Sequence, residues 1–180
     1  MRIVAGSRKG ARLFAPKGLD TRPTGDRVRE AVFNLLGPVD DADVLDLYAG
    51  SGAMGLEALS RGAARATFVE SDREAAETIL KNLDKLKLEG AVVLREDARR
   101  KLAADAAGGR RYDLVLIDPP YGMLPRILPS LASYLSAVVA ENGVAVVESA
   151  AADEPDLPLP KRTSRRYGSA RVTVFEGVKP

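Results

Sequence analysis

The 180-residue chain contains no cysteine and no histidine. Their absence excludes disulfides, thiolate nucleophiles, Cys/His zinc sites and imidazole general bases. Any catalysis must therefore use carboxylates, backbone groups and a bound cofactor, and we expect no metal site. The lack of disulfides also fits a reducing cytoplasm.

Long apolar runs are missing as well. None approaches the roughly 20 residues that span a bilayer, and basic residues at positions 2, 8, 9, 12 and 17 leave no signal-peptide core. We therefore expect a cytoplasmic protein that does not act at a membrane. With 46% hydrophobic residues the chain can bury one core but is short for two ordinary domains. This favours an N-terminal extension over residues 1–36 followed by one domain over residues 37–180.

Charge is divided unevenly along the chain. Residues 1–36 carry eight Lys and Arg against three Asp and Glu, whereas the remainder carries nineteen against twenty-two. A basic extension on a mildly acidic body favours a polyanionic partner, although a solvated tail would give the same pattern. The second basic cluster, at Lys161, Arg162, Arg165, Arg166 and Arg171, favours the polyanion. The candidate contacts in the extension are Arg8, Lys9, Arg12, Arg22, Arg27 and Arg29.

Strand and helix patterns alternate over most of the sequence, which predicts an α/β fold with a mostly parallel sheet covered on both faces. Short Leu- or β-branched-rich runs predict strands at 44–48, 66–70, 91–95, 114–117 and 144–148. Helices are expected from a cap at Thr24 or Asp26, from Asp72 to Lys87, and over 124–140. An alternating stretch around Gly168, over 167–176, predicts a closing hairpin, and 103–109 and 150–160 are expected to be surface connections.

The fourth predicted strand runs into Asp118-Pro119-Pro120-Tyr121. The prolines lack N–H groups and restrict the backbone, so the carbonyls of Asp118 and Pro119 remain as fixed acceptors. Tyr121 adds a flat face for stacking. This combination suits a planar exocyclic amine, which needs acceptors for its hydrogens and a platform for its ring. Taken alone, the same residues are also compatible with a simple turn.

A second element follows the first predicted strand. Gly50, Gly52 and Gly55 have the G-x-G-x-x-G spacing that lets a backbone approach a nucleotide-like ligand, and Glu70 ends the next strand, where a carboxylate can accept both hydroxyls of a ribose. Asp97 follows the third strand at the same edge, where it suits either a ligand contact or a helix cap. The glycine pattern alone would also fit a tight turn.

Asp46 distinguishes between cofactors. A carboxylate beside the glycine loop disfavours a pyrophosphate and favours a ligand that carries an ammonium and a sulfonium. Asp46 therefore favours S-adenosylmethionine over NAD, although a structural strand-end Asp remains an alternative. A methyl donor beside an amine-binding segment indicates amino-methyl transfer.

The combination of these motifs resembles the Rossmann-like, S-adenosylmethionine-dependent amino-methyltransferases. More narrowly, three segments resemble the D type of the bacterial guanine-N2 methyltransferases that act on 16S ribosomal RNA: Arg22-Pro-Thr-Gly-Asp-Arg-Val-Arg-Glu30, Gly50-Ser-Gly-Ala-Met-Gly-Leu-Glu-Ala-Leu-Ser-Arg61 and Val147-Glu-Ser149. The likeness runs from about Arg2 to Tyr167. It departs from the family at Gly25, where a second Thr is common, which loosens the expected helix start.

The resemblance implies roles for individual residues. Asp46, Gly50 and Gly52 would border the methionine part of the cofactor, Glu70 its ribose, and Asp97 with Ala98 its adenine. The full expected cofactor set is Asp46, Tyr48, Gly50, Ser51, Gly52, Glu70, Ser71, Asp97 and Ala98. The expected catalytic set, which would hold the target base, is Asp118, Pro119, Pro120 and Tyr121.

The substrate implied by the resemblance is an unpaired guanine of 16S rRNA, because a paired base cannot enter such a pocket. With no separate recognition domain, we expect the chain to recognise a preformed surface such as an assembling small ribosomal subunit. Amino-methylation of adenine or cytosine in DNA or other RNA is the nearest alternative. A protein glutamine methyltransferase fits less well, since that class usually has Asn in place of Asp118. A noncatalytic RNA-binding module and an NAD-dependent dehydrogenase are the remaining alternatives.

Overall fold

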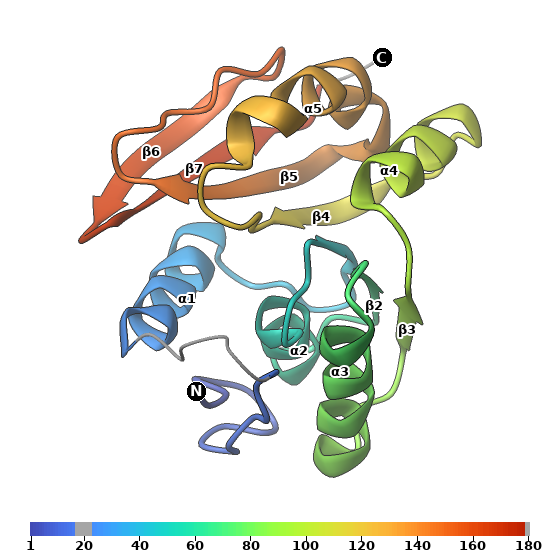
Figure 1. Cartoon of the computed structure of the whole chain (residues 1–180), viewed down its shortest axis with the longest axis vertical. Helices are drawn as coiled ribbons and strands as arrows, with labels where there is room; N and C mark the ends of the chain where they lie inside the picture. The colour runs from blue at the N-terminus through green and yellow to red at the C-terminus, as the bar shows by residue number, and fades with distance from the viewer. Residues whose placement is uncertain (17–22, 179–180) are drawn as a thin grey trace.

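The computed structural model describes residues 1–16 and 23–178, and within them seven strands form one sheet in the order β3-β2-β1-β4-β5-β7-β6. Figure 1 shows this sheet running through the molecule with helices around it. In chain order the elements are α1 (Pro23–Leu36), β1 (Asp43–Leu47), α2 (Ala53–Ser60), β2 (Arg65–Val69), α3 (Arg73–Leu86), β3 (Ala91–Leu94), α4 (Ala98–Ala107), β4 (Tyr112–Ile117), α5 (Leu124–Val138), β5 (Val139–Ala150), β6 (Lys161–Tyr167) and β7 (Ala170–Glu176).

The first five strands are parallel, and β7 pairs antiparallel with both β5 and β6. The predicted mostly parallel sheet with a C-terminal antiparallel hairpin is therefore confirmed. Because parallel strands all end at one edge, the segments after β1, β2 and β4 lie side by side.

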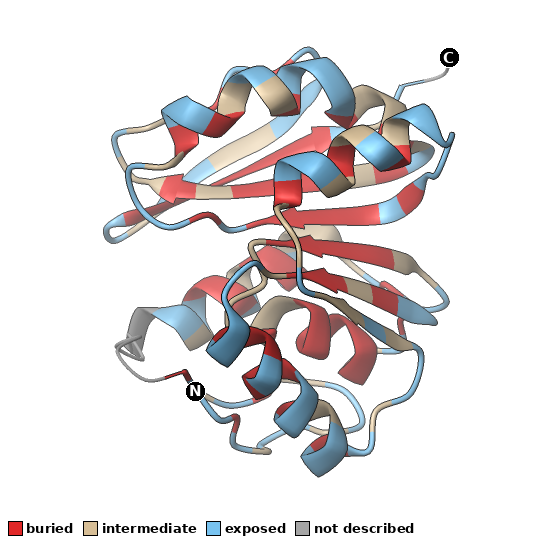
Figure 2. Ribbon diagram, turned by 45° about the vertical axis from the view of Figure 1, so that its right-hand side comes forward, coloured by how far each residue is buried: buried red, intermediate tan, exposed pale blue. Residues whose placement is uncertain are grey.

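Helices cover both faces of the sheet, and successive strand residues point to opposite faces. On one face, Phe33 of α1 and Leu56 of α2 pack with Leu114 of β4; on the other, Leu135 of α5 packs with Val115 of the same strand. Figure 2 shows the resulting buried strands between helices whose outer sides are exposed. Burial on both faces explains why the strands appear in the sequence as nearly continuous apolar runs.

The N-terminal segment is packed against the body of the protein. Arg2 and Arg12 form an isolated antiparallel bridge, and Ile3 and Leu13 belong to the same core cluster as α1 and α2. Their side chains are 1% and 9% exposed. Residues 1–13 thus contribute to the core although their composition is basic.

The structure corrects several expected boundaries. The surface connection expected at 103–109 is wrong, since α4 continues to Ala107; its alanines favour helix and Leu102 is buried. The hairpin predicted over 167–176 begins earlier, because its first strand starts at Lys161. The predicted cap by Asp72 is confirmed, with its side chain accepting a hydrogen bond from Ala75 N. None of the helices in the described ranges combines the length and apolarity that a bilayer crossing needs.

Candidate active site

A cleft of about 1050 Å³ opens at the carboxyl edge of the parallel strands. It is bordered by the segments that follow β1, β2 and β4, by the starts of α3, α4 and α5, and by part of α1. Open α/β sheets bind ligands at this edge. A smaller cleft of about 440 Å³ lies between Gly6, Phe33 and Arg61 and contains none of the predicted catalytic or cofactor residues.

The glycine loop forms one wall of the large cleft. Gly50 and Gly52 have φ values of 56° and 78°, a left-handed conformation that favours glycine. Tyr48 shares this conformation with φ 61°, which is uncommon for a non-glycine residue. At Gly55, in the first turn of α2, a methyl group would lie 2.4 Å from Phe68 Cε1, so the close approach of α2 to β2 requires glycine. Gly50 and Gly52 therefore allow the left-handed backbone of the loop, whereas Gly55 allows α2 to pack closely against β2.

Glu70, which follows β2, holds the glycine loop from the side. Its Oε2 accepts a hydrogen bond from Gly50 N at 2.8 Å, and its Oε1 accepts one from Asp72 N at 2.8 Å. These bonds fix the carboxylate at the cleft wall, beside Ser71. Each oxygen keeps a lone pair that can accept from a ligand hydroxyl.

Asp46 lies beneath the loop. Its side chain is 1% exposed, and its Oδ2 accepts a hydrogen bond from Gly55 N at 2.9 Å. Burial raises the pKa of this carboxyl well above its ordinary value, the Gly55 hydrogen bond opposes that shift, and the negative charges of Asp118 and Glu70 add to it. A cation placed at this end of the cleft would stabilise the ionised form.

Asp97 caps α4, which is one of the two roles predicted for it from the sequence. Its Oδ1 accepts hydrogen bonds from Arg99 N and Arg100 N, and its Oδ2 pairs with the Arg99 guanidinium at 3.0 Å. That guanidinium is the main cause of the lowered pKa of Asp97. Burial, with a smaller contribution from Asp97, raises the pKa of Tyr48 to about 12. Asp97 and Ala98 both line the cleft, so the cap also leaves them beside a ligand.

The segment Asp118–Tyr121 forms the opposite wall. Asp118 N donates to Leu47 O at 3.4 Å, which joins the ends of β4 and β1, and Met123 N donates to Pro120 O at 3.0 Å, which closes a turn. All four residues line the cleft, and the Tyr121 side chain is 45% exposed at its mouth. All of the predicted catalytic and cofactor residues except Gly52 thus line one cavity.

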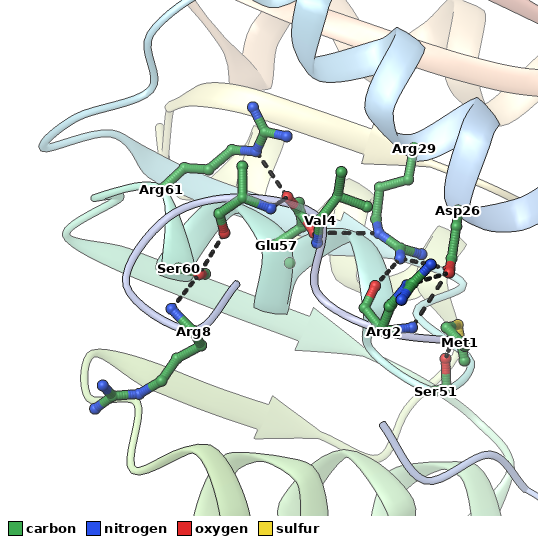
Figure 3. A network of polar contacts seen from close by, with 12 residues as sticks. Met1, Arg2, Val4, Arg8, Asp26, Arg29, Ser51, Glu57, Ser60 and Arg61 are labelled. Atoms are coloured by element: carbon green, nitrogen blue, oxygen red, sulfur yellow. Dashed lines mark hydrogen bonds and ion pairs between the residues drawn. The ribbon is translucent and has the colours of Figure 1, made fainter. Parts of the chain in front are cut away.

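The basic residues are distributed differently from the prediction. Arg29 is 3% exposed, and its guanidinium pairs with Asp26 and with the buried Glu57 (Figure 3). A side chain enclosed in this way has little surface to offer to RNA, so the structure does not support the predicted contact at Arg29. Arg8 donates to the carbonyls of Leu86 and Lys87. Lys9, Arg12 and Arg27 are exposed, and Arg22 lies outside the described residues.

Two buried polar residues were not expected from the sequence. Glu57, in α2, accepts hydrogen bonds from Val4 N and Ala5 N and also pairs with Arg61 (Figure 3). Asn82, in α3, accepts from Phe14 N and donates to the carbonyls of Phe14 and Ser51. An acid inside the apolar stretch Leu56-Glu-Ala-Leu59 is the one sequence signal that could have identified the first of them.

Together, the sheet order, the antiparallel last hairpin and the cleft at the carboxyl edge define a Rossmann-like methyltransferase fold. The chain belongs to the family described as conserved hypothetical protein 95, whose model matches residues 1–176.

Known proteins of this kind match over the whole chain or over its larger part. YlbH of Bacillus subtilis, whose name assigns it provisionally to the rRNA methyltransferases, is 38% identical over 98% of both chains. Ribosomal RNA small subunit methyltransferase D of Escherichia coli is 47% identical over 67% of this chain and 60% of its own length. The solved structure of yhhF from Escherichia coli is 36% identical, with a TM-score of 0.85 over 100% of this chain and 99% of that one. More distant structures with this fold, at 16% and 22% identity, contain S-adenosylhomocysteine or S-adenosylmethionine; their likeness shows the fold alone.

Proposed function

We propose that this protein transfers a methyl group from S-adenosylmethionine to the exocyclic N2 amine of an unpaired guanine in 16S rRNA. One observation carries the proposal: the glycine loop with Asp46 and Glu70, and the segment Asp118–Tyr121, form opposite walls of one cleft. The similarity to the rRNA methyltransferases named above supports an RNA substrate. The choice of guanine N2 rests on the resemblance of residues 22–30 to that family.

The cofactor half of the cleft has the chemistry that S-adenosylmethionine requires. When bound, this cofactor supplies an electrophilic methyl group on a sulfonium. Asp46 would stabilise its positive charge, Glu70 would accept hydrogen bonds from the ribose hydroxyls, and Asp97 with Ala98 would border the adenine. The left-handed backbone at Gly50, which lines the cleft, would let the loop approach the ligand without a Cβ atom in the way. At Gly52 an added Cβ would instead meet Ile79 and Leu56.

The remaining residues prepare the base. The N2 lone pair of guanine is delocalised into the ring, so the amine is a poor nucleophile until its hydrogens are held and its lone pair is turned toward the methyl group. The Asp118 carboxylate and the Pro119 carbonyl would accept those hydrogens, while Tyr121 would stack on the ring; all three residues line the cleft. The proton leaves after transfer, and no histidine or cysteine is required.

The substrate is an unpaired nucleotide presented by RNA in the small ribosomal subunit or its assembly intermediate, in the cytoplasm. A cleft of about 1050 Å³ holds one cofactor and one extruded base rather than a length of duplex. Comparing methyl incorporation into assembled subunits, naked rRNA and DNA tests this substrate. Equal rates on naked rRNA would contradict a preformed ribosomal surface, and preferential labelling of DNA would move the assignment to a DNA methyltransferase.

Asp118→Ala tests the catalytic assignment. Because the substitution removes the acceptor for the amine without altering the cofactor half of the cleft, methyl transfer should fall by about 10³-fold, while S-adenosylmethionine still binds. Transfer is measured with labelled cofactor, and cofactor binding by titration calorimetry. A variant that remains fully active would contradict the role of Asp118. If the wild-type protein binds no S-adenosylmethionine, the result would instead favour the alternative of a noncatalytic RNA-binding module.

A further inference from the structure

Three arginines line the large cleft, and two of them are already paired. Arg29 is enclosed between Asp26 and Glu57, and Arg99 is paired with Asp97. Arg126, in the first turn of α5, is exposed and forms no ion pair with any residue in the described ranges. It is therefore a cation at the cleft wall that is available to a ligand.

The carboxylates that line the cleft are most numerous in its cofactor half, while Asp118, after β4, and Glu148, in β5, line it as well. The cofactor half contains the carboxylates of Glu70, Asp72, Glu74, Glu96 and Asp97. These groups favour a cationic ligand and repel phosphates. Arg126 lies at the other end, five residues after Tyr121 and on the wall that would hold the base. RNA approaching Tyr121 is therefore directed toward the start of α5.

The C-terminal hairpin adds cations at the same end. Ala170 lines the cleft, and its partner across the ladder is Tyr167 of β6. Neighbouring strands are about 4.8 Å apart and rise about 3.4 Å per residue, so the backbones of Arg165 and Arg166 lie within about 10 Å of Ala170. Both side chains are exposed, on opposite faces of this edge strand, and neither pairs with a carboxylate in the part of the chain that the structure describes. Figure 1 shows β6 at the outer edge of the sheet, beyond β7.

Arg8, in the N-terminal segment, is much farther away. The start of α3, at Glu74 and Ala75, lines the cleft, whereas Arg8 contacts the carbonyls of Leu86 and Lys87 at the opposite end of that helix. Lys85 Nζ donates to Arg12 O at that end too. A rise of 1.5 Å per residue over this helix places Arg8 roughly 20 Å from the cleft, so Arg8 is poorly placed to hold phosphates that flank the target base. Arg12 lies nearer, three residues before the cleft-lining Ala15.

We propose that Arg126, Arg165 and Arg166 form the surface that contacts the phosphates of the RNA presenting the target base. This inference rests on the proposed function and specifies how its substrate docks. The RNA backbone crosses the start of α5 and the edge strand β6, while the base enters between Tyr121 and the glycine loop. The contacts are to phosphates, so they position the RNA without selecting its sequence.

Arg126→Gln and the double variant Arg165→Gln/Arg166→Gln test the surface, with Lys81→Gln as the control. Lys81 is exposed in α3, and its substitution removes the same charge elsewhere. Small-subunit particles serve as substrate, and KM for the particle, affinity for S-adenosylmethionine and the salt dependence of particle binding are measured. Each arginine lost should raise KM about five- to tenfold and lower the slope of log affinity against log salt by about one. Cofactor affinity should remain unchanged, as should all values for Lys81→Gln.

The outcomes separate this inference from the proposed function. If the wild-type protein methylates the particle but both arginine variants keep its KM and salt slope, the proposed surface is wrong. Equal losses in Lys81→Gln would overturn it too, since net charge would then explain the effect. If the Arg165→Gln/Arg166→Gln variant self-associates more but binds the particle as before, these arginines protect the edge of the sheet and do not contact RNA. A wild-type protein that methylates no RNA would contradict the proposed function itself.

Discussion

Asp46 shows how one buried carboxyl can oppose stability while preparing a site. Its pKa in the folded protein is raised above the ordinary value of 3.8, chiefly by burial. Between pH 3.8 and that raised pKa, the folded state therefore binds a proton that the unfolded state has released. The free energy of unfolding therefore falls as pH rises through this window. The stabilisation that Asp46 contributes by binding this proton is fully present only below the window. At neutral pH the Asp46 carboxyl thus makes the free protein less stable.

Asp46→Asn should remove this penalty. The amide oxygen can still accept from Gly55 N, and the neutral group has no charge to bury, so stability at neutral pH should equal or exceed that of the wild type. Urea unfolding of both proteins from pH 4 to pH 8 checks this, because their difference removes contributions from Asp97 and Glu154, whose lowered pKa values have the opposite sign. Affinity for S-adenosylmethionine should fall with the loss of the negative charge. A difference that does not change with pH would contradict the raised pKa.

At the same scale, the roles of charged residues were the least predictable part of the sequence. Arg29 looked like an exposed cation because surface arginine is the usual case. Its burial depends on Glu57, 28 residues later in the chain, which no local pattern connects with it. Glycine spacing and strand-end carboxylates could be interpreted locally, and Gly50 and Glu70 line the cleft.

Among the secondary-structure elements, α2 has an unusual double role. Its first turn carries the glycine loop, and its last turns hold Glu57 and Ser60, which bind the N-terminal segment. Glu57 is completely buried and contacts Val4, Ala5, Arg29 and Arg61. This carboxylate therefore joins the N-terminal segment and α1 to the helix that supports the cofactor loop.

Glu57→Gln should be strongly destabilising. The substitution leaves the buried Arg29 with only the partly exposed Asp26 as a countercharge and weakens the acceptor for two backbone N–H groups, which should cost about 3–5 kcal/mol of unfolding free energy. Urea unfolding measures the loss. Glu77→Gln is the matched control, since it breaks the exposed pair with Arg73 and should leave the midpoint unchanged. Equal small effects at both positions would show that the Glu57 contacts contribute little.

Element boundaries followed the sequence where a capping residue marked them. Asp72 and Asp97 identified the starts of α3 and α4 because a short polar side chain before a helix satisfies its first N–H groups. The end of α4 was missed because Ala103–Ala107 precedes two glycines and lacks a strong apolar pattern. The first strand of the hairpin was missed because the edge strand β6 is largely exposed and rich in arginine.

On the scale of the whole molecule, parallel topology assembles the cleft from residues far apart in the chain. Asp46 lies near the end of β1, and Glu70, Asp97 and Asp118 follow β2, β3 and β4; the sheet order brings all four to one edge. Strand order is not contained in local periodicity, but the rule that parallel strands bind ligands at their carboxyl ends made the cleft predictable. The return of residues 1–16 across α2 and α3 follows no such rule, because it depends on long-range contacts of Glu57, Ser60 and Asn82.

Deletion of residues 1–13 provides a test at this scale, because a basic arm and a structural segment respond differently to it. An arm would lose RNA affinity and leave the fold intact. Here the deletion removes the buried side chains of Ile3 and Leu13, each worth about 1.5–3 kcal/mol, and exposes Glu57 without its backbone partners Val4 and Ala5. The combined loss approaches the roughly 5–15 kcal/mol that stabilises a typical domain. We therefore expect the truncated chain to melt at a much lower temperature or not to fold, as measured by circular dichroism. If the truncated protein keeps its melting temperature and binds S-adenosylmethionine normally, residues 1–13 are a basic arm and not a structural segment.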